Sequence, residues 1–177
     1  TLLVFTKKRH LSFLSMADSA CLGLITGQMI GRWGNFINCE AFGRYTDCLF
    51  AMRIRRSIVN ESMISQNLID HLILDNGIEY IQVHPTFLYE SLWNFGLLMF
   101  MLWFRKRKTF TGEMLCIYLA GYGIGRAWIE GLRTDSLLIP GTQIAVSQAL
   151  SVVLATVSLV ILIYNRRKAF VQRKEAN

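Results

Sequence analysis

The chain has 177 residues, of which 53% are hydrophobic and 18% are charged, and its mean hydropathy is +0.35. This composition is typical of a protein embedded in a membrane. The net charge of +7 does not indicate a nucleic-acid-binding protein, because the basic residues lie in separate short clusters beside apolar segments instead of being gathered on one folded face with aromatic residues between them.

Four segments reach or approach the length of about 20 residues that a membrane-spanning helix needs. They lie at about 11–30, 86–104, 112–133 and 142–164. The last is the clearest, since no charge falls within it, whereas Asp18 and Gln28 interrupt the first. The sequence therefore predicts an all-α polytopic membrane protein with about four transmembrane helices.

Basic residues flank these spans in three clusters, which hold twelve of the 19 Lys and Arg residues. The clusters lie at 7–9, 105–108 and 166–174. Four spans would place all three on one side of the membrane, and the positive-inside rule makes that side the cytoplasm. We therefore predict a multi-pass protein whose C-terminal tail, residues 165–177, is cytoplasmic.

Residues 44–83 form the only substantial segment outside the predicted spans, and we expect them to make a small extracytoplasmic α+β head insertion. Leu49–Ile54 and Tyr80–Val83 are prone to form strands and can pair. Between them, one apolar helical face ending at Asn76-Gly77 is formed by Leu68, Ile69, Leu72 and Ile73. The whole chain, residues 1–177, is thus expected to be a single membrane-embedded domain.

Glycines recur at four-residue spacing in two of the spans, at Gly23, Gly27 and Gly31 and at Gly121 and Gly125. Small residues at this spacing let helix backbones approach closely in lipid, so both stripes predict helix packing.

The four cysteines and three histidines are scattered and contain no Cys-x-x-Cys pair. We therefore expect no metal site. A disulfide between Cys39 and Cys48 is sterically conceivable, but their spacing alone does not establish it.

The most polar stretch near a span runs from Gly31 to Gly43, immediately after the first apolar segment. It contains one arginine, two asparagines, a glutamate and three glycines. Polar groups at the end of a membrane-length segment are costly unless partners satisfy them or they serve a site. A cation, amide groups and a carboxylate together suit the binding of a polar lipid head group.

Two further stretches carry candidate functional residues. His84-Pro85 opens the second span and is followed by Tyr89 and Glu90. A carboxylate within a span is expensive and often functional, although Glu90 can also simply pair with a neighbouring helix.

In the second stretch, Arg126, Glu130 and Arg133 are spaced four and three apart, so they share one face of a continuous helix. An intrahelical ion pair explains one arginine but leaves the other over. Because the guanidinium fork matches phosphate oxygens, we favour a phosphate clamp at the outer membrane boundary.

The three stretches, in this order, resemble the motifs of bacterial prolipoprotein diacylglyceryl transferase. The resemblance is carried by Gly31-Arg32-x-Gly34-Asn35-Phe36-Ile37-Asn38-x-Glu40-x-x-Gly43, by His84-Pro85-x-x-Leu88-Tyr89-Glu90 and by Gly125-Arg126-x-x-x-Glu130-x-x-Arg133. Cys39, Phe87 and Ala127 stand where the family usually has glycine, glutamine and phenylalanine. The family's preceding half, which has further helices and a His-Gly-Gly motif implicated in catalysis, is not seen before Lys7, so we expect an incomplete fragment that is inactive on its own.

The resemblance implies transfer of the diacylglyceryl group from phosphatidylglycerol to the cysteine thiol of the lipobox segment in prolipoproteins. The product is a thioether, and glycerol phosphate is released. The implied place is the bacterial cytoplasmic membrane, with the active site facing the outer leaflet. The implied partners are phosphatidylglycerol, lipobox segments and the lipid bilayer, with no nucleic acid and no cofactor.

The resemblance also implies roles for individual residues. The catalytic set is Arg32, Asn35, Glu40, Arg126 and Glu130, and the phosphatidylglycerol-binding set is Arg32, Asn38, Gly43, Arg126 and Arg133. In these sets the arginines stabilise the phosphate, the asparagines bind the head-group glycerol or orient the arginines, the glutamates hold the arginines in place, and the glycine permits a turn. His84 and Tyr89 are auxiliary candidates.

Two other functions use the same residues. One is a non-catalytic membrane protein that binds phosphatidylglycerol, and the other is an anionic-solute transporter with arginines near the bilayer midplane. The position of Arg32, Arg126 and Arg133 near the ends of their spans disfavours the transporter.

Overall fold

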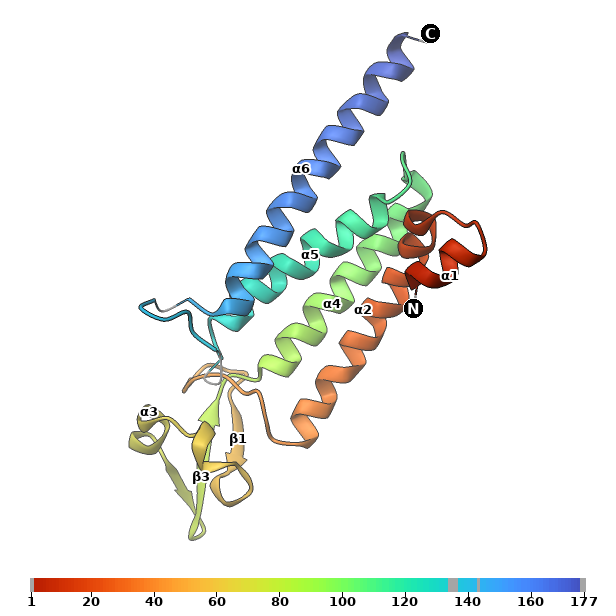
Figure 1. The fold of residues 1–177 in the computed structure, drawn as a ribbon. Coiled ribbons are helices and arrows are strands. Elements are labelled where there is room, and N and C mark those ends of the chain that lie inside the picture. The colour runs from red at the N-terminus through yellow and green to blue at the C-terminus, as the bar shows by residue number, and fades with distance from the viewer. Residues whose placement is uncertain (1, 134–136, 143, 176–177) are drawn as a thin grey trace.

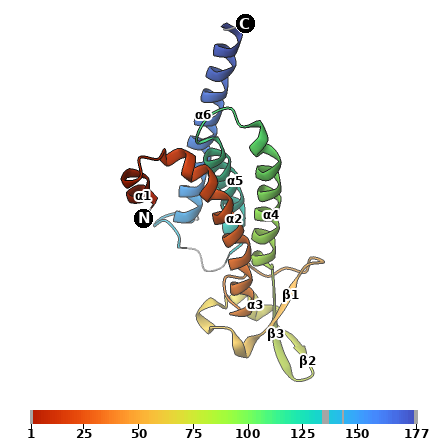
Figure 2. The same ribbon diagram turned by 90° about the vertical axis from the view of Figure 1, so that its right-hand side faces the viewer.

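The structure is a computed structural model that describes residues 2–133, 137–142 and 144–175. Within these ranges, four long helices lie side by side, and a small sheet lies beyond one end of them (Figures 1 and 2). The helices are α1 (Leu2–Lys8), α2 (Phe13–Ile37), α3 (Gln66–Asp70), α4 (Thr86–Phe104), α5 (Glu113–Glu130) and α6 (Val146–Glu175), and the strands are β1 (Met52–Arg55), β2 (Ile73–Asp75) and β3 (Ile78–Val83). Short 3₁₀ turns occupy Arg56–Ile58, Glu61–Met63 and Arg105–Arg107.

Three helices in the described part of the chain are long and apolar enough to cross a membrane, namely Phe13–Ile37, Thr86–Arg107 and Val146–Gln172. The fourth predicted position holds α5, which carries three charged residues. Its two glutamates are buried and paired. Glu113 Oε1 lies 2.5 Å from Arg166 Nε, and Glu130 Oε2 lies 2.8 Å from Arg126 Nη2. Since α5 packs against α2, α4 and α6, the bundle itself satisfies these charges.

The basic segments gather at one end of the bundle. Figure 1 shows α1, the turn between α4 and α5, and the C-terminal part of α6 at the end opposite the sheet. Residues 165–175, expected as part of a tail, continue α6 as a helix and project beyond the other helices.

Asp18, which interrupts the first apolar segment, joins α2 to the start of α5. Its buried carboxylate accepts hydrogen bonds from Lys108 Nζ at 2.9 Å and from the backbone N–H groups of Gly112 at 2.8 Å and Leu115 at 2.9 Å. The first N–H groups of a helix have no partner within it, so Asp18 caps α5 from a neighbouring helix.

The two glycine stripes differ in what covers them. A Cβ at Gly121 would lie 2.5 Å from Leu97 Cδ1, and one at Gly125 would lie 2.3 Å from Trp93, so the prediction of close packing is confirmed for α5. A Cβ at any glycine of the α2 stripe (Gly23, Gly27 and Gly31) would meet no described atom within 4 Å. The prediction is therefore wrong for α2 among the described residues, because spacing determines which residues share a face but not what lies against it.

The small sheet has the strand order β1-β3-β2 and is antiparallel throughout. Met52 pairs with Val83 and Arg55 with Tyr80, so the predicted pairing of these two segments is confirmed. Its buried core consists of Phe42, Ile54, Val59, Leu68, Ile81 and Val83. The polar motif begins within the last turns of α2 and ends in the loop after it; Phe42 comes from this loop, so the core joins the motif to the sheet.

The helix predicted before Asn76 is largely wrong. α3 ends at Asp70, and Ile73 begins β2, where it pairs with Tyr80. Asn76 and Gly77 have φ values of 51° and 78°, and they form the turn between β2 and β3. Asn-Gly favours this left-handed hairpin turn, which outweighs the helical spacing of the apolar residues before it.

Cys39 and Cys48 are both free thiols, so the conceivable disulfide is not formed.

Gly123 offers a direct test of the close contact between α5 and α6. A Cβ there would lie 2.7 Å from the backbone oxygen of Ser151 and 3.1 Å from Ala155 Cβ. Because backbone cannot move aside as a flexible side chain can, Gly123→Ala should lower the free energy of unfolding by about 1–3 kcal/mol. The measurement is unfolding in detergent followed by circular dichroism.

Gly27→Ala is the matched control, since its Cβ would meet no described atom within 4 Å. Alanine favours helix over glycine by about 1 kcal/mol, so this variant should be neutral or slightly more stable. Equal destabilisation by the two substitutions would contradict the packing described for α5 and α6.

Candidate functional site

The loop after α2 joins the beginning of α4 to the end of α5. The backbone N–H of Gly43 donates to the carbonyl oxygen of His84 at 3.0 Å, and that of Arg44 donates to Leu132 at 2.9 Å. His84 N–H donates in turn to Arg44 at 3.0 Å. These hydrogen bonds bring the three motif-bearing segments together at the junction of bundle and sheet.

Gly43 is needed there because the segments approach closely. A Cβ at this position would lie 2.7 Å from His84 Cβ, 3.1 Å from the backbone oxygen of Leu132 and 3.2 Å from Thr86 Cγ2. The turn that the sequence attributed to Gly43 is made by other residues, since the left-handed φ values of 52° and 55° belong to Cys39 and Ala41. Gly43 thus provides space for close packing.

Four charged side chains from three helices form one connected group, which we call the arginine–glutamate cluster: Arg32 of α2, Glu90 of α4, and Arg126 and Glu130 of α5. Arg32 pairs through Nε with Glu90 Oε2. Arg126 reaches Glu90 Oε1 through Nη1 at 2.9 Å and Glu130 Oε2 through Nη2 at 2.8 Å. Glu90 therefore lies between the two arginines and joins α2 to α5.

The cluster is largely withdrawn from solvent. Each arginine side chain is 19% exposed, whereas the side chains of Glu90 and Glu130 are 7% and 4% exposed. Two cations and two anions balance in charge, which offsets the cost of taking each from water. A guanidinium carries five N–H donors, more than these contacts use, so both arginines retain capacity for a further anionic ligand.

The space directly beside the cluster is small. A cavity of about 10 Å³ adjoins Glu90 and Arg126 and is also lined by Asn94 and Tyr122. This volume corresponds to about one water molecule. A larger ligand does not fit in this cavity.

Aromatic side chains pack between α2 and α4, next in sequence to the cluster residues of these helices. Phe87, which departs from the family pattern, packs against Trp33 and Phe36 with ring centroids 5.4 and 4.7 Å away. The indole N–H of Trp33 donates to Ser91 Oγ at 3.2 Å. Trp33 and Phe36 remain exposed, so an apolar surface lies next to the charged group.

The remaining residues of the first motif lie at the exit of α2. Asn38 is the C-cap that follows Ile37, the last residue of α2, and its side-chain Nδ2 donates to Glu40 Oε1 at 3.2 Å on the exposed surface. Within the described ranges, Glu40 makes no ion pair with an arginine, so the expected contact is not observed. Asn35 is half-buried on α2, three residues after Arg32.

The helical face expected for Arg126, Glu130 and Arg133 is interrupted. α5 ends at Glu130 and is followed by Gly131, so Arg133 lies beyond the helix. Its backbone instead forms an antiparallel bridge with Gly43. The prediction of one continuous face is wrong for Arg133 because pairing with the loop after α2 replaces the next helical turn.

Glu90, which holds the centre of the cluster, was not among the predicted site residues. The sequence left two interpretations open, a functional carboxylate or a pair with a neighbouring helix. The structure shows the pairing, and it is made with the two arginines predicted for the site. The available signal was the carboxylate inside an apolar segment.

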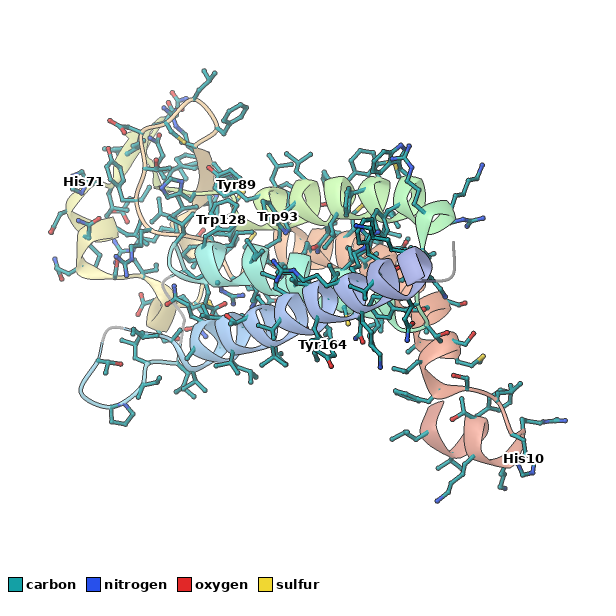
Figure 3. All side chains as sticks on the ribbon, turned by 90° about the horizontal axis from the view of Figure 1, so that it is seen from above. His10, His71, Tyr89, Trp93, Trp128 and Tyr164 are labelled. Atoms are coloured by element: carbon teal, nitrogen blue, oxygen red, sulfur yellow. The ribbon has the colours of Figure 1, made fainter. Side chains whose placement is uncertain are left out.

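His84 and Tyr89 meet at the entry to α4, where His84 Nδ1 lies 3.2 Å from Tyr89 Oη. Burial lowers the pKa of His84 below its usual value near 6.5, so the imidazole is neutral at pH 7. Trp128 stacks on Tyr89 with ring centroids 6.3 Å apart, and Figure 3 shows both near Trp93. Among the described residues, no group of three or more His, Cys, Asp or Glu could hold a metal ion.

A family model described as prolipoprotein diacylglyceryl transferase matches residues 1–164. The chain belongs to this family.

Similar proteins include enzymes named phosphatidylglycerol–prolipoprotein diacylglyceryl transferase from three bacteria. The protein of Bacillus velezensis is 37% identical over 99% of this chain, that of Bacillus cereus is 40% identical over 93%, and that of Geobacillus kaustophilus is 39% identical over 97%. The chain spans 60%, 56% and 58% of the lengths of these relatives.

The central position of Glu90 in this transferase-family chain predicts a large effect of Glu90→Gln on stability. The amide keeps the size of the side chain but leaves Arg32 and Arg126 without their shared anion. Removing one partner from buried ion pairs typically costs about 3–5 kcal/mol, and we expect a loss in that range. Unfolding in detergent measures it.

Glu79→Gln is the matched control. Glu79 Oε2 accepts from Arg56 Nη1 at 2.7 Å, but the two side chains are much more exposed than the cluster, at 49% and 34%. Exposed pairs contribute about 0–1 kcal/mol, so this loss should be small. If Glu90→Gln and Glu79→Gln lowered the free energy of unfolding by similar amounts, the buried ion pairs of the cluster would contribute no more to stability than an exposed pair.

Proposed function

We propose that the protein transfers the diacylglyceryl group from phosphatidylglycerol to the cysteine thiol in the lipobox of prolipoproteins. The observation that carries this proposal is the meeting of Arg32 and Arg126, from two different helices, at the single carboxylate of Glu90. Family membership and the names of the relatives supply the substrates and the reaction.

The chemistry makes two demands on the site. The thiolate attacks the carbon of the diacylglyceryl group that is linked through oxygen to the phosphate. A carbon–sulfur bond forms, and the bond between this carbon and the phosphate oxygen breaks. The electron pair of that bond leaves with glycerol phosphate. Fixed cations next to the leaving group stabilise its growing negative charge, which is the role we propose for Arg32 and Arg126.

Phosphate binding competes with Glu90 for the guanidinium groups. Phosphate oxygens match the planar donor fork of arginine, so a bound head group can take over contacts made to the carboxylate. Glu130 then keeps Arg126 oriented through the pair at 2.8 Å. The exposed aromatic surface of Trp33 and Phe36 suits contact with the acyl chains.

The other motif residues have supporting roles in this proposal. Asn35 and Asn38 bind the glycerol hydroxyls of the head group, and Glu40 orients Asn38 through their hydrogen bond at 3.2 Å. Gly43 allows the close approach of the loop to α4 and α5, and Arg133 adds a cation at the end of α5.

The proposal includes a membrane orientation. α2, α4, α5 and α6 span the bacterial cytoplasmic membrane, and the sheet forms an extracytoplasmic head of the single domain. The gathering of basic segments at the opposite end of the bundle supports a cytoplasmic C-terminus. Because Glu90 lies near the start of α4 and Arg126 near the end of α5, the cluster then faces the outer leaflet.

The transfer is tested by incubating the complete protein that contains this chain with phosphatidylglycerol and a lipobox peptide. Mass spectrometry should show a diacylglyceryl group on the peptide cysteine and release of glycerol phosphate. Lipid binding without modification of the peptide would instead indicate a binding protein, and uptake of an anionic solute into proteoliposomes would indicate a transporter.

Substitutions of the two arginines test the phosphate contact. Arg32→Ala and Arg126→Ala should each lower the transfer rate by about 10²–10³-fold, the usual effect of losing one such contact. Arg126→Lys should also be poor, because a point charge cannot reproduce the fork. Initial rates with saturating phosphatidylglycerol measure the effect, with membrane insertion checked for each variant.

Arg56→Ala is the control for these variants, since Arg56 is outside the cluster and pairs with Glu79 on the sheet surface. It should keep the rate of the unsubstituted protein. Full activity in both cluster alanine variants would rule out the proposed phosphate contact.

A further inference from the structure

Three side chains that the phosphate chemistry does not use meet close to the arginine–glutamate cluster. Tyr89 Oη lies 3.2 Å from His84 Nδ1 and 3.9 Å from Cys48 Sγ. The three come from the loop before β1, the segment after β3 and the second turn of α4. Tyr89 directly precedes Glu90 in α4, so this group adjoins the place proposed for the phosphate.

The pKa of the exposed Cys48 thiol indicates how the residues around Tyr89 affect a nearby thiol. Hydrogen bonding with the Thr46 side chain, with smaller contributions from the Phe50 backbone and the Tyr89 hydroxyl, lowers the pKa of Cys48. Desolvation of the sulfur acts in the opposite direction, and the nearby carboxylate of Asp47 adds a smaller effect of the same sign. A hydroxyl that donates to a thiolate stabilises its charge, so Tyr89 contributes, after Thr46 and the Phe50 backbone, to the reactive form of this thiol.

The rim of this place is apolar. Leu49 and Phe50, which directly follow Cys48, are 94% and 65% exposed. Trp128 stacks on Tyr89 and is 45% exposed. Exposed apolar side chains around a polar centre are typical of a surface that receives an apolar partner.

We propose that Tyr89 is the docking point of the acceptor thiol, beside Cys48, and that Leu49, Phe50 and Trp128 contact the apolar residues next to the acceptor cysteine. The partner is thus an apolar peptide segment that carries a cysteine, as the proposed function, on which this inference rests, requires. These residues form the peptide-binding part of the site, and the arginine–glutamate cluster forms its lipid-binding part.

His84 acts through Tyr89 and is a positioning residue. In this proposal the neutral imidazole takes the tautomer that carries its hydrogen on Nδ1 and donates to Tyr89 Oη, which directs the phenolic O–H at the sulfur. The hydrogen bonds run from imidazole to phenol to thiolate, and no proton needs to leave His84. The phenol can therefore stabilise a thiolate without being ionised itself.

The first test measures alkylation of Cys48 by iodoacetamide against pH, residue by residue, with the chain in lipid nanodiscs. In Tyr89→Phe the phenolic donor is lost, so labelling below the midpoint should be about 3–10-fold slower and the midpoint should move to higher pH. His84→Ala should give a smaller shift in the same direction. An unchanged Cys48 profile in Tyr89→Phe would overturn the proposal.

Cys39 provides an internal control in the same molecules. It is partly buried against the core of the sheet, and neither Tyr89 nor His84 donates to its sulfur. Its labelling should stay the same in both variants. If Cys39 changed equally, the effect would come from altered folding and the proposal would fall.

The second test measures docking of the peptide. The probe is a lipobox peptide whose cysteine forms an activated disulfide with thionitrobenzoate. The Cys48 thiolate attacks the sulfur of the peptide cysteine, so a mixed disulfide forms and thionitrobenzoate is released. At each cysteine, the reaction rate with the peptide is divided by the rate with a small activated disulfide. This ratio should be about 10-fold higher at Cys48 than at Cys39. The double variant Leu49→Ser/Phe50→Ser should remove this advantage without slowing the small reagent, and a peptide with no advantage at Cys48 would refute the docking point.

These measurements need no lipid transfer, so the two proposals can fail separately. Trapping at Cys48 without transfer in the complete protein would preserve the docking point and refute the proposed function. Diacylglyceryl transfer without trapping at Cys48, and without an effect of Tyr89→Phe on Cys48 labelling, would preserve the proposed function and refute the docking point.

Discussion

The arrangement of the helices depends on the ion pairs that the Glu90 carboxylate makes with two arginines. This carboxylate is buried where α2, α4 and α5 meet, and there its charge is stable only with cations beside it. Arg32 and Arg126 supply them, which fixes the face that α2 and α5 turn towards α4. Two guanidinium groups can approach one another at this depth because an anion lies between them. The same property makes the position suitable for a phosphate.

A network of backbone hydrogen bonds holds the loop after α2 against the bundle. Gly43 and Arg44 bond to the segments that begin α4 and follow α5, and Phe42 enters the core of the sheet. The sheet therefore does more than cap the bundle, since it positions His84 and the motif loop together. This explains how residues from three distant parts of the sequence reach one side of the molecule.

The lipid and peptide sides of the proposed reaction meet at two consecutive residues of α4. Tyr89 faces the exposed thiol of Cys48, whereas Glu90 faces the arginines. Successive residues of a helix point about 100° apart, so one helical turn presents two different chemical groups to two neighbouring surfaces. A phospholipid and a cysteine-bearing peptide can thus approach the same point from different directions, as a transfer between them requires.

The sequence by itself determined the long apolar helices, the pairing of β1 with β3, the family, and the presence of Arg32, Arg126 and Glu130 in one group. These features follow from local patterns, such as apolar length, strand propensity and motif order. It did not determine that Glu90 joins the arginines, that Glu40 pairs with Asn38, or that the α2 glycine stripe meets no described helix. Nor did it place Tyr89 between His84 and Cys48, or end α5 before Arg133. Only the tertiary structure decided these points, because periodicity states which residues share a face, whereas the partner of that face depends on how all the helices pack.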